Sequence, residues 1–206
     1  MSKQKSSNGW MARHVNDSYV KKSKADGYRS RAAYKILELD EKDRVFKPGM
    51  TVVDLGAAPG GWSQVASHSV GENGRIIALD LLPVDSYPQV EFIQGDFREN
   101  AIFEKLLEIL NGAPVDLVIS DMAPNITGQR VIDQSKSMYL LELALDFALQ
   151  VLKPGGDFVA KAFEGAGMAE YRKQIQSNFA KCYNRKPGSS RAESRELFVI
   201  GKGRKS

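Results

Sequence analysis

The chain has 206 residues, of which 42% are hydrophobic and 26% are charged, and its net charge is +4. This size and composition predict one globular domain, and no apolar run approaches the roughly 20 residues of a membrane helix. Cys182 is the only cysteine, which excludes an internal disulfide. Because the polar start also lacks an apolar signal core, we expect a cytoplasmic protein without membrane contact.

The charge is distributed unevenly along the chain. Residues 1–35 carry a net charge of +7, residues 36–180 carry −9, and residues 181–206 carry +6. Two basic ends on an acidic body predict a polyanionic partner that both ends contact together. The alternative interpretation is a pair of solvated tails.

Residues 1–18 are polar and basic, and we expect a flexible segment there, followed by a single domain over 19–206. A helix is predicted over 28–45, and "KPGM" at 47–50 ends it. Apolar runs predict buried strands at 51–55, 75–80, 90–96, 115–121 and 157–163, and helical patterns separate them at 61–70, 99–110 and 134–152. "KPGG" at 153–156 ends the last of these helices. A helix near 167–178 and two strands at 179–186 and 196–203 complete the chain. Alternating strands and helices predict a parallel sheet with helices on both faces.

The stretch "DLGAAPGGW", from Asp54 to Trp62, lies at the first strand-to-helix turn. Gly56, Gly60 and Gly61 allow the backbone to approach a ligand closely. The pattern is not GxGxxG, which disfavours a nicotinamide-dependent reductase, and Asp54 precedes the turn. A carboxylate there would repel phosphate and attract a cation, which favours a sulfonium ligand such as S-adenosylmethionine (AdoMet).

The next three predicted strands each end in an aspartate. Asp80 lies where a ribose diol is usually held, Asp96 is placed to reach an adenine amino group, and Asp121 lies on the same rim. Each aspartate alone could be a helix cap or a turn residue. Four of them at one sheet edge, beside a glycine-rich turn, favour a cofactor site.

The motifs "KPGMTVVDLGAAPGGWSQ", "IALDLLP", "QGDF", "SDMAPN", "LKPGG", "KAFEG" and "SRAESRE" resemble the FtsJ/RrmJ family of ribosomal RNA 2′-O-methyltransferases. The resemblance runs from about Arg13 to the C-terminus. It implies an α/β, Rossmann-like class I methyltransferase fold, with a mostly parallel seven-stranded sheet and an antiparallel last strand. It also implies a uridine of 23S rRNA as substrate, within an assembled or nearly assembled 50S subunit.

The resemblance further implies AdoMet contacts at Gly60, Trp62, Asp80, Asp96 and Asp121. The catalytic tetrad of the family falls on Lys35, Asp121, Lys161 and Glu196, with Lys161 as the proton acceptor.

Physical chemistry supports a lysine in that role. Methyl transfer to a hydroxyl needs in-line alignment and removal of a weakly acidic proton. Burial and a neighbouring ammonium both favour neutral lysine, and Lys161 lies in the apolar run "FVAKAF" with Lys35 as the second cation. Asp121 and Glu196 act in the opposite direction and would orient the amines. Lys161 could instead be a cation that steers the hydroxyl, and the sequence leaves both roles open.

Basic side chains on both sides of the tetrad positions are candidates for RNA backbone contacts: Lys21, Lys22, Arg29, Arg31, Arg191 and Arg195. Tyr19, Tyr28 and Tyr34 lie among the first four and could stack on bases, although Tyr34 fits the core better. We expect a monomer that needs no metal. Alternatives are a 2′-O-methyltransferase for tRNA or an mRNA cap, and a non-catalytic ribosome-assembly factor. Methylation of a base nitrogen is disfavoured, because the loop over 121–125 lacks the second proline and the aromatic residue of such enzymes.

Overall fold

The structure is a computed structural model that describes residues 17–191 and 193–206. Residues 1–16 of the predicted flexible segment lie outside the described residues. The first described helix, α2 (Ser18–Ala25), was not predicted, and the Asp17 carboxylate caps it by accepting a hydrogen bond from the Tyr19 amide. Eight residues with only two buried side chains give too weak a periodic signal for a sequence prediction.

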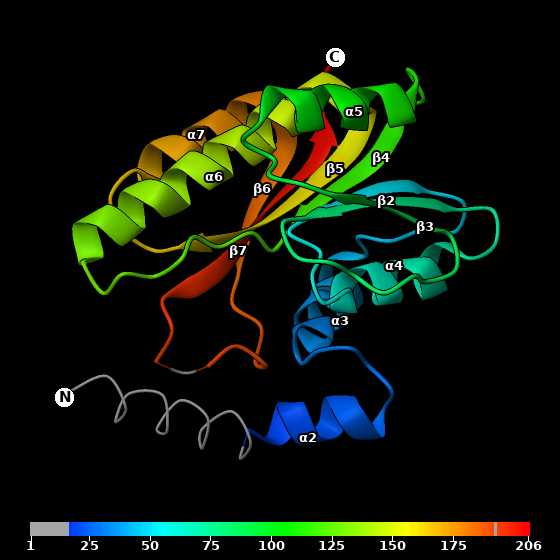
Figure 1. Cartoon of the computed structure of the whole chain (residues 1–206). Helices are drawn as coiled ribbons and strands as arrows, with labels where there is room; N and C mark the ends of the chain where they lie inside the picture. Colours follow the sequence, from blue (N-terminus) through cyan, green and yellow to red (C-terminus); the bar gives the residue numbers. More distant parts are fainter. Residues whose placement is uncertain (1–16, 192) are drawn as a thin grey trace.

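Seven strands form one sheet in the order β3-β2-β1-β4-β5-β7-β6 (Figure 1). The strands are β1 (Thr51–Leu55), β2 (Arg75–Asp80), β3 (Val90–Gln94), β4 (Val115–Ser120), β5 (Leu152–Phe163), β6 (Phe179–Arg185) and β7 (Glu196–Arg204). The first five strands pair in parallel, and β7 runs antiparallel to both β5 and β6. The predicted seven-stranded sheet with an antiparallel last strand is confirmed.

Helices cover both faces of this sheet (Figure 1). Helices α3 (Ala32–Asp43) and α4 (Gly61–Val70) pack on one face, where Ile36 and Val65 belong to one apolar core. Helices α5 (Asn100–Leu110), α6 (Arg130–Val151) and α7 (Met168–Asn178) pack on the other, where Leu106, Leu145 and Ile175 belong to a second core. Burial on both faces explains why the strands are continuous apolar runs.

Several predicted boundaries differ from the structure. Helix α3 is shorter than the predicted 28–45 and ends where Arg44 adopts a left-handed conformation, with φ of 48°. Helix α6 begins four residues before the predicted 134, because the Asp133 carboxylate accepts hydrogen bonds from the Thr127 and Gly128 amides and fixes the preceding turn. Such side-chain contacts leave little trace in the hydrophobic pattern.

The "KPGG" stretch was expected to separate a helix from a strand, but it lies within β5. Pairing of Val115 with Leu152 extends this strand backwards, with a register shift before Leu117 pairs with Asp157.

The strand order reverses between β1 and β4, which are neighbours at the centre of the sheet. Ligands of open α/β sheets bind beyond the carboxyl ends of strands at this point. The candidate site lies there.

Candidate active site

The four tetrad positions come from α3, β5, β7 and the residue after β4. Lys161 Nζ lies 3.0 Å from Asp121 Oδ1 and donates a hydrogen bond of 2.5 Å to the Asp121 backbone carbonyl. Lys35 Nζ lies 2.7 Å from the Glu196 carboxylate. Because β5 and β7 are antiparallel, Phe163 pairs with Glu196 and Lys161 pairs with Phe198, which brings the start of β7 to the end of β5. The structure therefore joins all four side chains into two adjacent ion pairs.

The Glu196 carboxylate is the electrostatic link between these pairs. Burial raises the pKa of Glu196, but the Lys35 ammonium, the Ser190 hydroxyl and the Lys161 charge together bring it below the usual value. Ser190 Oγ donates to Glu196 Oε1 at 2.8 Å. Glu196 therefore stays ionised and fixes the Lys35 amine beside Lys161.

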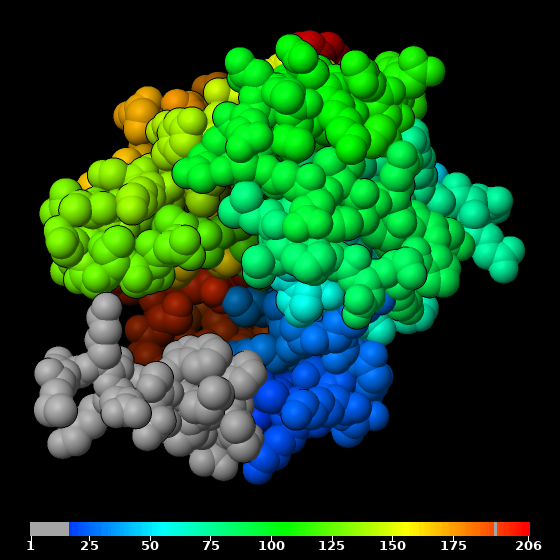
Figure 2. All heavy atoms as spheres, viewed as in Figure 1, coloured from blue at the N-terminus to red at the C-terminus, as the bar shows by residue number. Residues whose placement is uncertain are grey.

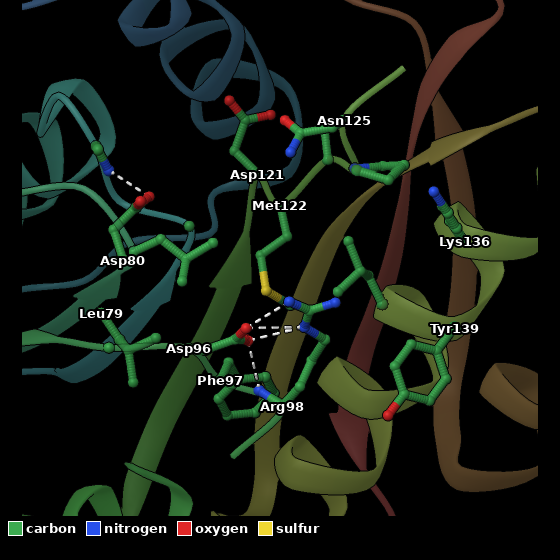
Figure 3. A pocket seen from close by; sticks show the side chains of 17 residues that line it. Leu79, Asp80, Asp96, Phe97, Arg98, Asp121, Met122, Asn125, Lys136 and Tyr139 are labelled. Carbon is green, nitrogen blue, oxygen red and sulfur yellow. Dashed lines mark hydrogen bonds and ion pairs between the residues drawn. The ribbon is translucent and has the colours of Figure 1, made fainter. Parts of the chain in front are cut away.

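A cavity of about 360 Å³ lies next to Asp121, beyond the ends of β2, β3 and β4 (Figure 3). Its lining includes Gly56, Asp80, Asp96 and Asp121, four of the eight predicted cofactor residues. Apolar walls come from side chains such as Leu79, Phe97 and Met122. A cavity with three carboxylates (Asp80, Asp96 and Asp121) and apolar walls suits a ligand that combines a flat apolar ring, hydroxyl groups and a positive charge.

Asp80 is held rigidly in the cavity wall. Its two carboxylate oxygens accept hydrogen bonds from the Ala58 and Leu82 amides, both at 2.9 Å. A carboxylate has about four lone-pair positions, so two remain for a ligand. Asp80 is thus oriented to accept from a pair of hydroxyls.

The Asp96 carboxylate, unlike that of Asp80, is hydrogen-bonded to a neighbouring arginine, Arg98. The Arg98 amide, Nε and Nη2 all donate to its carboxylate at 2.5 to 3.0 Å. The Arg98 hydrogen bonds hold the pKa of Asp96 below its ordinary value. Contact between Asp96 and an adenine amino group would require Arg98, which also lines the cavity, to release part of this carboxylate.

The other predicted cofactor residues do not line this cavity. Asp54 is fully buried behind the glycine turn and accepts from Ser63 Oγ at 2.6 Å. A Cβ at Gly60 would lie 2.7 Å from Arg29 Nη1, and one at Gly61 would collide with Ser30 Oγ. Trp62 is 2% exposed and donates from Nε1 to the Ala32 carbonyl at 2.8 Å. In the described structure, therefore, the turn and Trp62 pack against the chain that leads into α3.

The candidate RNA contacts fall into two groups. Lys21 and Lys22 are exposed on α2. Arg29 donates to the Asp85 and Ser86 carbonyls at 2.8 and 2.9 Å, and Arg31 is ion-paired with Asp17. Lys22 Nζ lies 4.8 Å from the centre of the Tyr34 ring, but both lysines remain exposed to a partner, whereas Arg29 and Arg31 hold the fold together.

The remaining two candidates lie around the start of β7. Arg191 is exposed, with its Nε 3.7 Å from Asp17, and exposed Arg195 donates to the Glu164 carbonyl at 3.2 Å. The three tyrosines pack together, with ring centroids of Tyr19 and Tyr28 at 5.4 and 5.6 Å from Tyr34. Tyr34 is buried, as predicted.

Sequence reasoning missed Arg98, Lys136 and Tyr139, which all line the cavity. Lys136 and Tyr139 extend from α6 on the side opposite Asp80 (Figure 3). The helical pattern of α6 was interpreted only through its buried residues. An exposed tyrosine three positions after a lysine, on the helix following "SDMAPN", was the available signal.

Among residues 17–191 and 193–206, no three histidine, cysteine or acidic side chains lie together as metal ligands would. The helices in the same ranges are all too short or too polar to span a bilayer.

A doubly covered sheet with a carboxylate-lined cavity at its switch point is the arrangement of a Rossmann-like α/β domain. The chain belongs to the FtsJ-like methyltransferase family, which matches residues 28–204. It is 59% identical to the ribosomal RNA large subunit methyltransferase E of Acinetobacter baumannii, over 98% of this chain and 93% of that protein. The Cellvibrio japonicus protein of the same name is 58% identical, over 98% and 96%.

Among solved structures, a protein of Plasmodium falciparum described as a ribosomal RNA methyltransferase superposes with a TM-score of 0.76. The two chains are 32% identical, and the match covers 86% of this chain and 98% of the other. The expectation of an FtsJ-type methyltransferase, drawn from the motifs, is confirmed.

Proposed function

We propose that the protein transfers a methyl group from AdoMet to a ribose 2′-hydroxyl of large-subunit ribosomal RNA, with a uridine of 23S rRNA as the target. The observation that carries the proposal is the joined tetrad of Lys35, Asp121, Lys161 and Glu196 beside a carboxylate-lined cavity. The names of the relatives support the class of substrate.

The residues of the cavity fit AdoMet. Asp80 has free lone pairs for the ribose diol, Phe97 and Leu79 suit an adenine ring, and the Asp121 carboxylate suits a sulfonium. When bound, AdoMet would supply an electrophilic methyl group beside the tetrad. Each chain carries the complete tetrad, which supports a monomer as the acting unit.

Lys161 is the proposed general base. A neutral amine has two N–H bonds, and the Asp121 carbonyl and Oδ1 are both within reach of them. The lone pair of Nζ is then left for the proton of the ribose hydroxyl. The Lys35 ammonium, which Glu196 holds in place, would help to stabilise a developing alkoxide, and the Asp121 carboxylate would orient the Lys161 amine.

Nucleoside mass spectrometry tests the proposal. Large ribosomal subunits from cells without this activity are incubated with the protein and AdoMet, and the rRNA is digested. We expect one 2′-O-methylated uridine for each 23S rRNA. A methyl group on a base nitrogen or carbon, or methylation of tRNA instead, would contradict the proposal.

The exposed lysines of α2 give a prediction about RNA binding. Lys21→Ala combined with Lys22→Ala should weaken RNA binding and reduce the slope of log affinity against log salt by about two, one for each lost phosphate contact. The measurement is filter binding to large-subunit RNA over a salt series. Lys105→Ala combined with Lys173→Ala removes two other exposed lysines, from α5 and α7, and serves as the control, although Lys173 is paired with Glu170. An unchanged slope in the α2 variant would exclude these lysines as phosphate contacts.

A further inference from the structure

Four of the six exposed large apolar side chains among residues 17–191 and 193–206 lie in one region, and the other two are Leu81 and Leu82. Ile126, Val131, Ile132 and Tyr139 are 65%, 79%, 42% and 50% exposed, and all four lie on the segment from the end of the β4–α6 loop into α6. The first turns of α6 project from the body of the domain (Figure 1). Apolar surface concentrated in this way marks an interaction site more often than a chance exposure.

A cavity of about 600 Å³, here called the α6 groove, runs beside this segment. Its α6 wall contains Val131, Ser135, Met138 and Tyr139, and its other wall contains residues 165–167 and Arg195. From Val131 to Tyr139 the helix rises about 12 Å. The groove therefore presents one side of the exposed segment to a chain-like ligand.

The α6 groove connects the two parts of the candidate active site. Tyr139 lines both this groove and the cofactor cavity. Arg130 and Arg195 line both the groove and a further cavity of about 700 Å³ that contains Glu196 of the tetrad. Figure 2 shows a recess between the α6 lobe and α3, with β7 at its back. By these shared residues the groove adjoins both the cofactor cavity and the cavity that contains Glu196.

The exposed segment is held in place by polar contacts. Asp133 accepts from the Thr127 amide and hydroxyl, both at 2.8 Å, and from the Gly128 amide at 3.0 Å. Gln134 Nε2 donates to the Phe163 and Ala166 carbonyls at 3.2 and 3.1 Å, which ties α6 to the opposite wall. The apolar side chains are thus presented on an ordered support, which lowers the entropic cost of binding.

The chemistry of the groove fits unpaired RNA. Arg130 is exposed, and within the described ranges its side chain forms no hydrogen bond or ion pair. The lining of the groove contains two basic residues, Arg130 and Arg195, and one acidic residue, Glu142. Duplex RNA offers mainly phosphates and 2′-hydroxyls, whereas splayed single strands also offer bases that stack on aromatic side chains. A groove that is lined by an exposed tyrosine and two arginines matches the second case.

We propose that the α6 groove binds unpaired nucleotides next to the target ribose, with Tyr139 stacked on a base and Arg130 paired with a phosphate. This inference rests on the proposed RNA methyltransferase function and adds a path for the substrate strand. Tyr139 would thereby help to select a target in a loop rather than in a helix.

The test compares Tyr139→Ala and Tyr139→Phe in filter binding to protein-free large-subunit rRNA and to large subunits. Loss of one stacked base should weaken RNA binding by about 5- to 150-fold in Tyr139→Ala, and Tyr139→Phe should restore it. Arg130→Ala should reduce the salt slope by about one. Arg75→Ala, which removes a half-buried arginine paired with Glu91 at the start of β2, should leave the slope unchanged.

Titration of each variant with AdoMet alone separates this inference from a cofactor role of Tyr139. Weaker AdoMet binding in Tyr139→Ala with unchanged RNA affinity would overturn the inference, and so would unchanged affinity for both. An effect on large subunits without any effect on protein-free rRNA would assign the groove to a ribosomal protein and would also overturn it. Failure of the proposed function is recognised separately, because the wild-type protein would then methylate no rRNA.

Discussion

Lys161→Ala is expected to lower the rate of methyl transfer by about 10²- to 10⁴-fold, the range that a positioned general base contributes. Affinity for AdoMet should remain close to that of the wild type, because Lys161 contacts Asp121 and does not line the cofactor cavity. A filter assay with tritiated AdoMet measures the rate, and calorimetry measures cofactor affinity. Lys153→Ala is the matched control, since Lys153 lies on the same strand and is also paired with an aspartate, Asp116.

Lys161→Arg distinguishes a base from a steering cation. Arginine keeps the positive charge and the hydrogen bonds but does not give up its proton in proteins. If Lys161 is the base, the arginine variant should be as inactive as the alanine variant. Substantial activity in Lys161→Arg would contradict the role of base and assign Lys161 to electrostatic steering.

Asp54→Asn is expected to flatten the pH dependence of stability. Asp54 is fully buried, and its Oδ1 has no hydrogen-bond partner, whereas Oδ2 accepts from Ser63. Burial raises the pKa of Asp54 to about 7, with Asp121 and Asp80 adding to the rise and the Ser63 hydroxyl opposing it. In the unfolded chain an aspartate titrates near 3.9.

The direction of this effect follows from proton linkage. Between pH 4 and pH 7 the native state holds a proton on Asp54 that the unfolded chain has lost, so the free energy of unfolding falls as pH rises. Above pH 7 the Asp54 contribution is constant. From pH 5 to pH 8 the wild type should therefore lose up to about 3 kcal/mol more than Asp54→Asn, at 1.36 kcal/mol for each pKa unit.

Urea unfolding at pH 5, 6, 7 and 8 measures this difference. In the variant, the asparagine NH₂ group replaces Asp54 Oδ1, which has no hydrogen-bond partner. This buried donor would find no acceptor, so the free energy of unfolding of the variant is expected to be lower than that of the wild type. The slope with pH is the diagnostic quantity. Glu91→Gln removes an exposed carboxylate and controls for the change in net charge. Parallel curves for the wild type and Asp54→Asn would exclude a protonated Asp54 in the native state.

The burial of Asp54 also explains why the sequence predicted the glycine turn less accurately than it predicted the fold. Asp54 next to a glycine-rich turn suggested a carboxylate facing a cation, but the structure places that carboxylate beneath the turn. Gly60 and Gly61 allow close packing of Arg29 and Ser30, which are about 30 positions earlier in the chain. Which neighbour uses the space of a missing Cβ is decided by tertiary packing, and no local pattern records it.

The basic residues illustrate the same limit. The sequence gives the same expectation for four basic residues, namely Lys21, Lys22, Arg29 and Arg31. In the structure, however, Arg29 donates hydrogen bonds to the carbonyls of residues 85 and 86, and Arg31 is ion-paired with Asp17. Charge counts predict that a surface is basic, but they do not predict which cations are already paired within the fold.

From its sequence alone, the chain can be assigned to an α/β sheet, to the methyltransferase family, and to a set of four candidate catalytic positions. The sheet follows from apolar periodicity, which is a property of neighbouring residues. The family and the four positions are implied by the resemblance of the long motifs to FtsJ-type methyltransferases. The tertiary structure decided that the tetrad forms two adjacent ion pairs, that Arg98 occupies Asp96, and that Tyr139 joins two cavities. Each of these depends on side chains from separate elements meeting in space, and their distances are set by packing.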